Sequence, residues 1–217
     1  SPSIFRPWGV WQVCLKALSC LVIRWRRRKM EGEEGIWKGK HGMGGKVRFV
    51  VNADDLGYSR ERDDGIFEAV SKGIVTSMSL LVNGPSAKSA IAKYMKIKMK
   101  LDEIGEEVPS LGLHINLTEG RPIASRHIVP SLLRENKNMA SMFRGKFGFE
   151  QAVYGKKINL EHVRIEALAQ IRWFYQNAGF YPSHVDGHNH VHVLPGVAPV
   201  VAALVAHFKI GWIRLPL

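Results

Sequence analysis

Residues 47–57, Val-Arg-Phe-Val-Val-Asn-Ala-Asp-Asp-Leu-Gly, set the pattern for the rest of the chain. The β-branched run Val47–Asn52 predicts a short strand, and two carboxylates and a glycine follow it closely. Arg60–Val70 then predicts a helix that Ser59 caps, and Ser77–Val82 predicts a second strand. A strand, a helix and another strand in this order are typical of a parallel sheet.

The same alternation continues to the end of the chain. The further predicted elements are a helix over Ala87–Ile104, a strand over Leu111–Leu117, a helix over Leu160–Asn177, a strand over Ser183–His188, a helix over Val197–Phe208 and a strand over Trp212–Leu215. The sequence therefore predicts an α/β fold with a parallel sheet, either open or closed into a barrel. Its 217 residues suit one domain but fall short of a complete (β/α)8 barrel, which takes about 250. Residues 120–155 indicate a long irregular insertion, which often forms part of a substrate site.

Residues 1–46 differ in composition from the rest. They hold ten Lys and Arg against three Asp and Glu, which is more than half of the net charge of +12. Lys16 interrupts their apolar stretch, which is too short to span a bilayer, and the basic run Arg24–Lys29 follows it, unlike in a signal peptide. We expect a poorly ordered or non-native leader over 1–46 that offers no strand to the sheet, and a domain over 47–217. An interfacial basic helix in the leader is the alternative.

Composition also limits the compartment and the partners. Cys14 and Cys20 are the two cysteines, too few for a disulfide framework or a four-cysteine zinc site, so we predict a reducing, cytoplasmic compartment. The basic excess comes without a recognition motif, so we expect no specific nucleic-acid partner and no membrane span. The oligomeric state stays open, a dimer included.

Polar clusters follow the first, third and fourth strands that we predict for the domain. Parallel α/β folds place their active sites at these carboxyl ends. In the first cluster, Asp54 and Asp55 point to opposite sides of the strand, which suits one for holding a metal and the other for acting as a base. Taken alone, two Asp before Gly57 are more typical of a turn. His114 in the second cluster would, alone, more often be a buried core residue.

The third cluster, at residues 184–192, has a histidine or an aspartate at every second position. While the chain stays extended, His184, Asp186, His188, His190 and His192 project to one face. Same-face residues lie about 6.6 Å apart along a strand, whereas metal–nitrogen bonds are about 2.1 Å. One or two of the five can therefore reach a single ion, and the others must orient ligands, bind substrate or move protons.

Together the three clusters offer one Asp and two His as metal ligands, with a second carboxylate beside them. A metal bound in this way supplies a Lewis acid and an acidified water, and the spare carboxylate can accept the water's proton. We therefore predict metal-assisted hydrolysis of an acyl group.

Four motifs resemble the signature of the YdjC-like carbohydrate (chitooligosaccharide) deacetylases, in order, over residues 47–217. They are Val-Asn-Ala-Asp-Asp-Leu-Gly at 51–57, Leu-Val-Asn-Gly at 81–84, Gly-Leu-His with Leu-Thr-Glu-Gly within 112–120, and His-Val-Asp-Gly-His-Asn-His-Val-His at 184–192. The resemblance implies a distorted (β/α) barrel that removes acetyl groups from N-acetylated sugars such as chito-oligosaccharides. It also implies a divalent ion, usually magnesium, held by Asp55, His114 and His188, with Asp54 as the catalytic base.

The end of the chain and the identity of the metal depart from the family pattern. Relatives continue for several strands and carry a His-Pro-Gly motif whose histidine is a candidate general acid, so we expect a domain truncated after Leu217. Two imidazoles and one carboxylate favour zinc or another transition ion over magnesium, which prefers oxygen ligands. The alternatives are metal-dependent phosphoester hydrolysis and a truncated form that binds metal or sugar without turnover.

Overall fold

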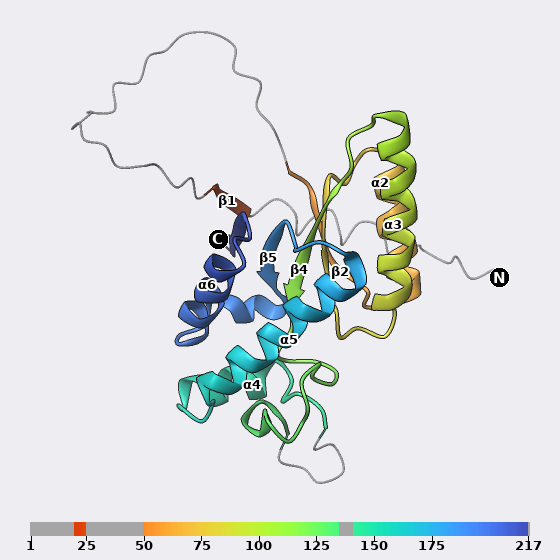
Figure 1. The fold of residues 1–217 in the computed structure, drawn as a ribbon. Helices are drawn as coiled ribbons and strands as arrows, with labels where there is room; N and C mark the ends of the chain where they lie inside the picture. The colour runs from red at the N-terminus through yellow and green to blue at the C-terminus, as the bar shows by residue number, and fades with distance from the viewer. Residues whose placement is uncertain (1–19, 25–49, 135–140, 217) are drawn as a thin grey trace, which may run out of the picture.

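The computed structural model describes residues 20–24, 50–134 and 141–216 of the 217-residue chain (Figure 1). The rest of the expected leader, the beginning of the first predicted strand at 47–49 and Leu217 lie outside the described residues. The described helices and strands are β1 (Cys20–Arg24), β2 (Asn52–Leu56), α2 (Arg60–Ser71), β3 (Ser77–Leu80), α3 (Ala87–Ile104), β4 (Ser110–Ile115), the 3-10 helix η1 (Pro130–Leu132), α4 (Lys146–Tyr154), α5 (Leu160–Ala178), β5 (His184–Gly187), the 3-10 segment η3 (His188–Val193), α6 (Val197–His207) and β6 (Trp212–Pro216).

The strands form one sheet in the order β1-β6-β5-β4-β3-β2. Strands β2 to β6 pair in parallel, which confirms the predicted α/β fold. The expectation that the leader offers no strand is wrong, because Cys20–Arg24 pairs antiparallel with Trp212–Pro216. The antiparallel strand meets the β6 backbone that β5 leaves free, and so satisfies hydrogen-bonding groups at that edge.

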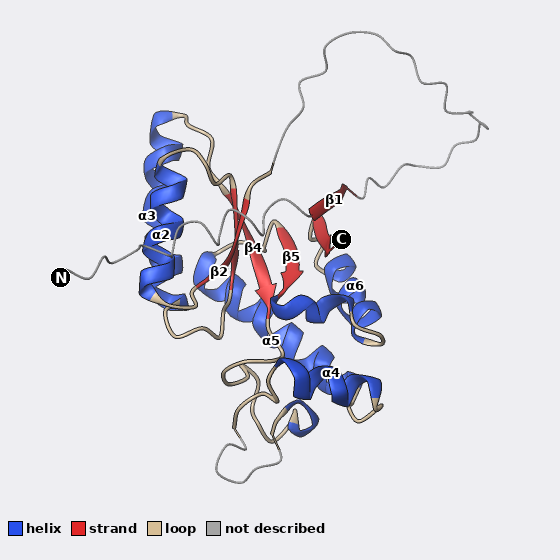
Figure 2. Cartoon of the chain, turned by 180° about the vertical axis from the view of Figure 1, so that it is seen from behind, coloured by secondary structure: helices blue, strands red, loops and turns tan. Residues whose placement is uncertain are grey.

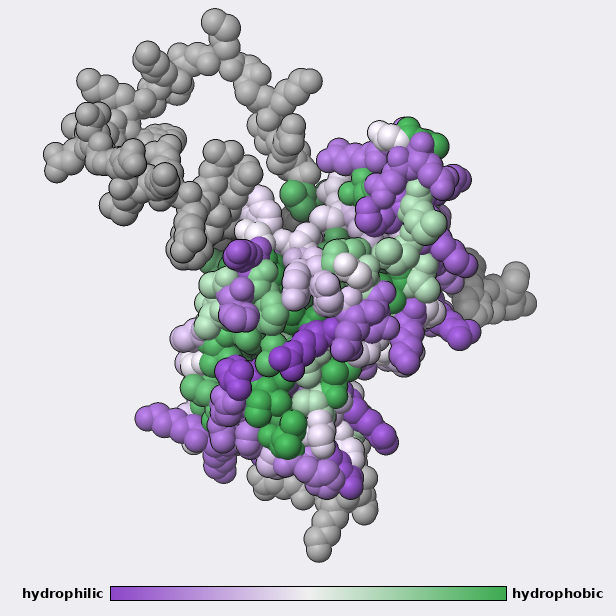
Figure 3. All heavy atoms as spheres, viewed as in Figure 1, coloured by the Kyte–Doolittle hydropathy of each residue, from purple (hydrophilic) through white to green (hydrophobic). Residues whose placement is uncertain are grey.

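Helix α5 is central among the helices that pack beside the sheet. Helix α5 contacts strand β4 and lies between α3 and α6, both of which it also contacts. Figure 2 shows β2, β4 and β5 with the helices around them, seen from behind. In Figure 3 hydrophilic residues cover much of α3, whereas hydrophobic residues gather around α5 and α6. None of the helices that the structure describes is both long and apolar enough to cross a membrane.

The two faces of the sheet differ in chemistry because side chains alternate along each strand. Leu111, Leu113 and Ile115 of β4 belong to the hydrophobic core, as does Val185 of β5. The intervening side chains are polar or absent, and they include Ser77, Ser79, Gly112, His114, His184 and Asp186. This polar face carries the candidate site at its carboxyl end.

Most predicted boundaries agree with the structure to within a few residues, with two exceptions. Within the described residues the first strand of the domain lies over Asn52–Leu56, beyond the predicted end at Asn52, because Ala53 and Leu56 enter the core, whereas Val50 is mostly exposed. The segment 120–155, expected to be irregular, contains helix α4 over Lys146–Tyr154. Its Phe149 is fully buried, so tertiary packing stabilises a helix with two glycines near its beginning.

Gly84 illustrates how closely the backbones approach beside β2. A Cβ atom at Gly84 would lie 2.1 Å from the carbonyl oxygen of Gly57, a contact that only a backbone shift could relieve. We expect Gly84→Ala to lower the free energy of unfolding by about 1–3 kcal/mol, as for other overpacked sites. Gly65→Ala is the matched control, because nothing lies within 4 Å of its added Cβ and it lies within helix α2, where Ala is favoured. Equal stability of the two variants in urea unfolding would show that this contact is not tight.

Candidate active site

The sheet brings the three predicted metal-binding residues together. Asp55 lies near the carboxyl end of β2, His114 near that of β4, and His188 directly after β5. Because these strands are parallel, their ends meet at one edge of the sheet. Ligand atoms of the three residues all lie within 4.8 Å of one another, so they could hold one metal ion.

One carboxylate oxygen of Asp55 lies between the two imidazoles. Asp55 Oδ1 is 2.7 Å from His188 Nδ1 and 3.2 Å from His114 Nε2. Two ligands bound at about 2.1 Å to one ion lie about 3.0 to 3.4 Å apart in octahedral or tetrahedral geometry. The three side chains would therefore need only small shifts to admit an ion.

Asp186 fixes the orientation of His114. Its fully buried carboxylate lies 2.6 Å from His114 Nδ1, which turns the other ring nitrogen toward Asp55. Ser79 Oγ donates a hydrogen bond of 3.0 Å to the second oxygen of Asp186. This is the carboxylate–histidine pair that orients ligands in many metal sites.

The same contacts control the protonation of His114. Burial lowers the pKa of His114, but the charge of Asp186 and hydrogen bonds with Asp186 and Asp55 outweigh burial and raise the pKa to about 10. His114 is then a cation between two carboxylates, and an ion that binds its Nε2 must displace that proton.

Asp55 is held in an uncommon backbone conformation, with φ at 63°. Residues other than glycine adopt this region rarely, and when they do it is often at functional sites. Burial raises the pKa of the Asp55 carboxyl, but hydrogen bonds and charge from His114 and His188 lower it far more, so the pKa lies well below its usual range. Its other oxygen, Oδ2, is 2.5 Å from Arg62 Nη1.

His188 has a buried nitrogen that makes no hydrogen bond. Its Nε2 lies 3.4 Å from Glu119 Oε1 but has no hydrogen-bond partner among the described residues. An unsatisfied buried polar atom is costly unless something binds it. Because Nδ1 is the nitrogen that faces Asp55, the fit of this site to a metal ion rests on the Asp and His donor set and not on Nε2.

Asp54, the predicted base, lies beside this group and is bound by Arg214 of β6. Arg214 Nη1 and Nη2 donate to the two oxygens of Asp54 at 2.6 Å each, and Nη2 also lies 3.0 Å from Asp186 Oδ2. Asn52 Nδ2 donates to Asp54 Oδ1 at 2.8 Å. A carboxylate has about four lone-pair sites, so Asp54 still has an acceptor site for a water molecule.

The residues of the third cluster do not all share one face, as an extended chain would require. Strand β5 ends at Gly187, and Asn189 and His190 have φ values of 54° and 60°, so the chain turns away. The ring of His192 packs against Gly187, and its Nε2 donates to the Arg214 carbonyl at 2.7 Å. The ring of His184 packs against Gly112, where a Cβ would lie 2.4 Å from it. Both are structural contacts around the site.

Arg62, Ser79 and Arg214 contact the candidate site but were not predicted to do so from the sequence. Arg214 was assigned only to the last strand, although it binds both Asp54 and Asp186. Ser79 lies on the polar face next to His114 and Asp186. The alternation of Ser and apolar residues in Ser77–Leu80 was the available signal, since it marks a strand with one polar face.

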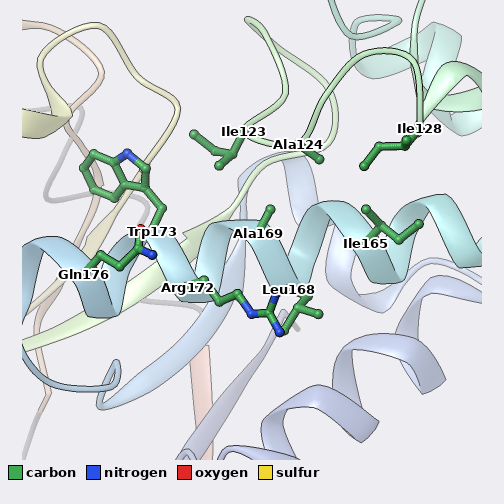
Figure 4. A pocket seen from close by; sticks show the side chains of 9 residues that line it. All are labelled: Ile123, Ala124, Ile128, Ile165, Leu168, Ala169, Arg172, Trp173 and Gln176. Atoms are coloured by element: carbon green, nitrogen blue, oxygen red, sulfur yellow. The ribbon is translucent and has the colours of Figure 1, made fainter.

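A separate cavity lies on the outer side of α5 (Figure 4). Its volume is about 410 Å³, and the loop after β4 and helix α5 line it with Ile123, Ala124, Ile128, Ile165, Leu168, Ala169, Arg172, Trp173 and Gln176. None of the predicted site residues lines this cavity, so we do not assign the chemistry to it.

The family model described as "YdjC-like protein" matches residues 48–217. The chain belongs to the YdjC-like family. The match begins just before β2 and includes all of the residues that converge at the candidate site.

Several curated relatives of this YdjC-like chain are named as deacetylases. A mouse "Carbohydrate deacetylase" is 44% identical over 172 residues, which is 79% of this chain and 51% of the relative. The human "Carbohydrate deacetylase" is 43% identical, over 79% of this chain and 49% of the relative. A Klebsiella pneumoniae "Chitooligosaccharide deacetylase" is 36% identical, over 71% and 54%. The chain thus spans about half the length of these relatives.

A solved structure also resembles this YdjC-like chain. It is a crystal structure from Enterococcus faecalis, described as that of a suggested cellobiose-phosphate cleavage protein, with 33% identity and a TM-score of 0.62. The match covers 74% of this chain and 56% of the other. It supports the α/β fold described above.

Proposed function

We propose that the protein is a metal-dependent hydrolase that removes acetyl groups from N-acetylated carbohydrates of the chito-oligosaccharide kind. The observation that carries this proposal is the convergence of Asp55, His114 and His188 from three strand ends, with Asp54 beside them. Relatives named as carbohydrate and chitooligosaccharide deacetylases support the choice of reaction and substrate class.

In this proposal Asp55, His114 and His188 hold a divalent ion. When bound, the ion would supply a Lewis acid that polarises the acyl carbonyl and acidifies a water molecule. Asp186 keeps His114 turned toward the ion through its contact with Nδ1. Glu119 lies 3.4 Å from His188 Nε2 and is the nearby carboxylate that could orient that ring.

Asp54 is the proposed general base. Its carboxylate accepts a proton from the water that attacks the acetyl carbonyl, while Arg214 and Asn52 hold it in place. Because its neighbour Asp55 is engaged by both imidazoles, the two adjacent carboxylates have separate tasks. The products are acetate and the free amine of the sugar.

The donor set supports zinc or another transition ion more than magnesium. Imidazole nitrogen suits zinc, copper, iron and nickel, whereas magnesium prefers oxygen ligands in octahedral geometry. The family resemblance, by contrast, implies that the bound ion is magnesium. Stripping the protein of metal and restoring it with each ion in turn would show which of these ions support turnover.

The rival reaction is hydrolysis of a phosphoester, and the description of the Enterococcus faecalis structure includes a sugar phosphate. Two assays with the same protein preparation separate the two reactions. One measures acetate released from N-acetylglucosamine oligomers, and the other measures phosphate released from a generic phosphoester. We expect acetate and no phosphate, whereas phosphate release without acetate would replace the proposed reaction with the rival.

A further inference from the structure

Three carboxylates lie around His114, and with it they make up two groups of residues that could each hold a metal ion. Besides Asp55, His114 and His188, the group of Asp54, His114 and Asp186 has ligand atoms within 4.8 Å of one another. The two groups share His114. Many hydrolases use two metal ions, so the second group is a candidate position for a second ion.

The second group is already bound by a cation of the protein itself. Arg214 reaches both oxygens of Asp54 at 2.6 Å and one oxygen of Asp186 at 3.0 Å. The side chain of Asp186 is fully buried and that of Arg214 is 11% exposed, so this contact is largely shielded from solvent. Arginine suits such a position because its planar guanidinium presents several donors at once.

The backbone that carries this guanidinium is also held in place. The Arg214 carbonyl accepts a hydrogen bond from Nε2 of the buried His192, and β6 pairs with β5 next to Asp186. The backbone of Arg214 is therefore held by the sheet and by η3.

We propose that Arg214 takes the place of a second metal ion between Asp54 and Asp186, and so limits the centre to one divalent ion. Charge balance supports this, because one divalent ion and one guanidinium offset the three carboxylates Asp54, Asp55 and Asp186. At the rim, Arg62 next to Asp55 and Glu119 next to His188 add one charge of each sign. Arg214 is a positioning residue in this account, since it holds Asp54 free of metal.

The proposal has a consequence for the reaction, and this part rests on the proposed function. A second ion would bind Asp54 and remove it as a base for the attacking water. Without Arg214, we therefore expect kcat to fall by about 100-fold or more while KM changes little, because the base acts in the chemical step.

The number of bound ions tests the proposal without any substrate. The full chain is dialysed against saturating Mn²⁺, bound metal per chain is measured by elemental analysis, and electron paramagnetic resonance distinguishes single ions from spin-coupled pairs. We expect one ion in the wild type and in Arg214→Lys, which keeps the charge. We expect a second ion and a coupled signal in Arg214→Ala, and one ion again in Arg214→Ala/Asp186→Asn.

The matched control is Arg164→Ala, which removes an arginine that binds Glu161 through two nitrogens on the exposed surface of α5. It should bind one ion and keep the wild-type turnover. Arg214→Gln serves if Arg214→Ala does not fold, as judged by circular dichroism. Two ions in the wild type would overturn the proposal, and so would one ion in a folded Arg214→Ala or Arg214→Gln. Failure to release acetate would instead overturn the proposed function and leave this count valid.

Discussion

Asp54→Asn should lower the rate of acetate release by about 100- to 10,000-fold, the usual contribution of a general base. The amide keeps the shape of the carboxylate and can still accept a hydrogen bond from Arg214, but it cannot take the proton of the attacking water. Metal affinity should change little, because Asp55, His114 and His188 are untouched. Steady-state kinetics and metal titration on the same sample check both parts.

Asp64→Asn is the matched control for this variant. Asp64 lies in helix α2 and binds Lys93 at 2.7 Å, but its side chain is 73% exposed. The control should have wild-type turnover. If Asp54→Asn bound metal and kept a near-normal rate, the base would have to be another residue.

The second large effect concerns the two imidazoles. We expect His114→Ala and His188→Ala each to weaken metal binding strongly. Loss of a residue that only orients a metal ligand weakens binding by about 10- to 100-fold, and loss of a ligand should weaken it more. His114→Ala should also lower the free energy of unfolding by about 1–3 kcal/mol, because the buried carboxylate of Asp186 loses a charged partner. His188→Ala, directly after β5, should lower the free energy of unfolding by less.

His207→Ala, at the exposed end of α6, is the control for both variants. Isothermal titration with Zn²⁺ and Mg²⁺ gives the affinities, and thermal unfolding of the metal-free proteins gives the stabilities. Unchanged metal affinity in either site variant would remove that histidine from the ligand set.

The parallel arrangement was predictable because each strand and helix has its own local signal. The predicted bounds of helix α3, Ala87–Ile104, match the structure, because a residue at the N-cap position precedes the helix and a glycine follows it. The convergence of the three polar clusters followed from a general rule on strand ends, whereas the choice of Asp55, His114 and His188 within them came from the family resemblance.

The parts that could not be predicted depend on contacts between distant residues. Nothing near Arg214 in the sequence shows that it pairs with Asp54, which is 160 residues away. The turn at Asn189 and His190 needs left-handed backbone that periodicity alone does not reveal, so the alternating histidines suggested a longer extended segment. The pairing of β1 with β6 likewise depends on the free edge of β6, which lies far away in the sequence, although Val22 and Ile23 favour a strand.

The most direct test of the account is release of acetate from an N-acetylglucosamine oligomer under single-turnover conditions, with protein in excess over substrate. Excess protein allows slow turnover to be detected. The protein is first stripped of metal with a chelator and then restored with Zn²⁺, Mn²⁺ or Mg²⁺. The account predicts that the stripped protein releases no acetate, and that at least one ion restores release of acetate together with the free amine. Absence of acetate with every ion, from protein that is folded and binds metal, would contradict it.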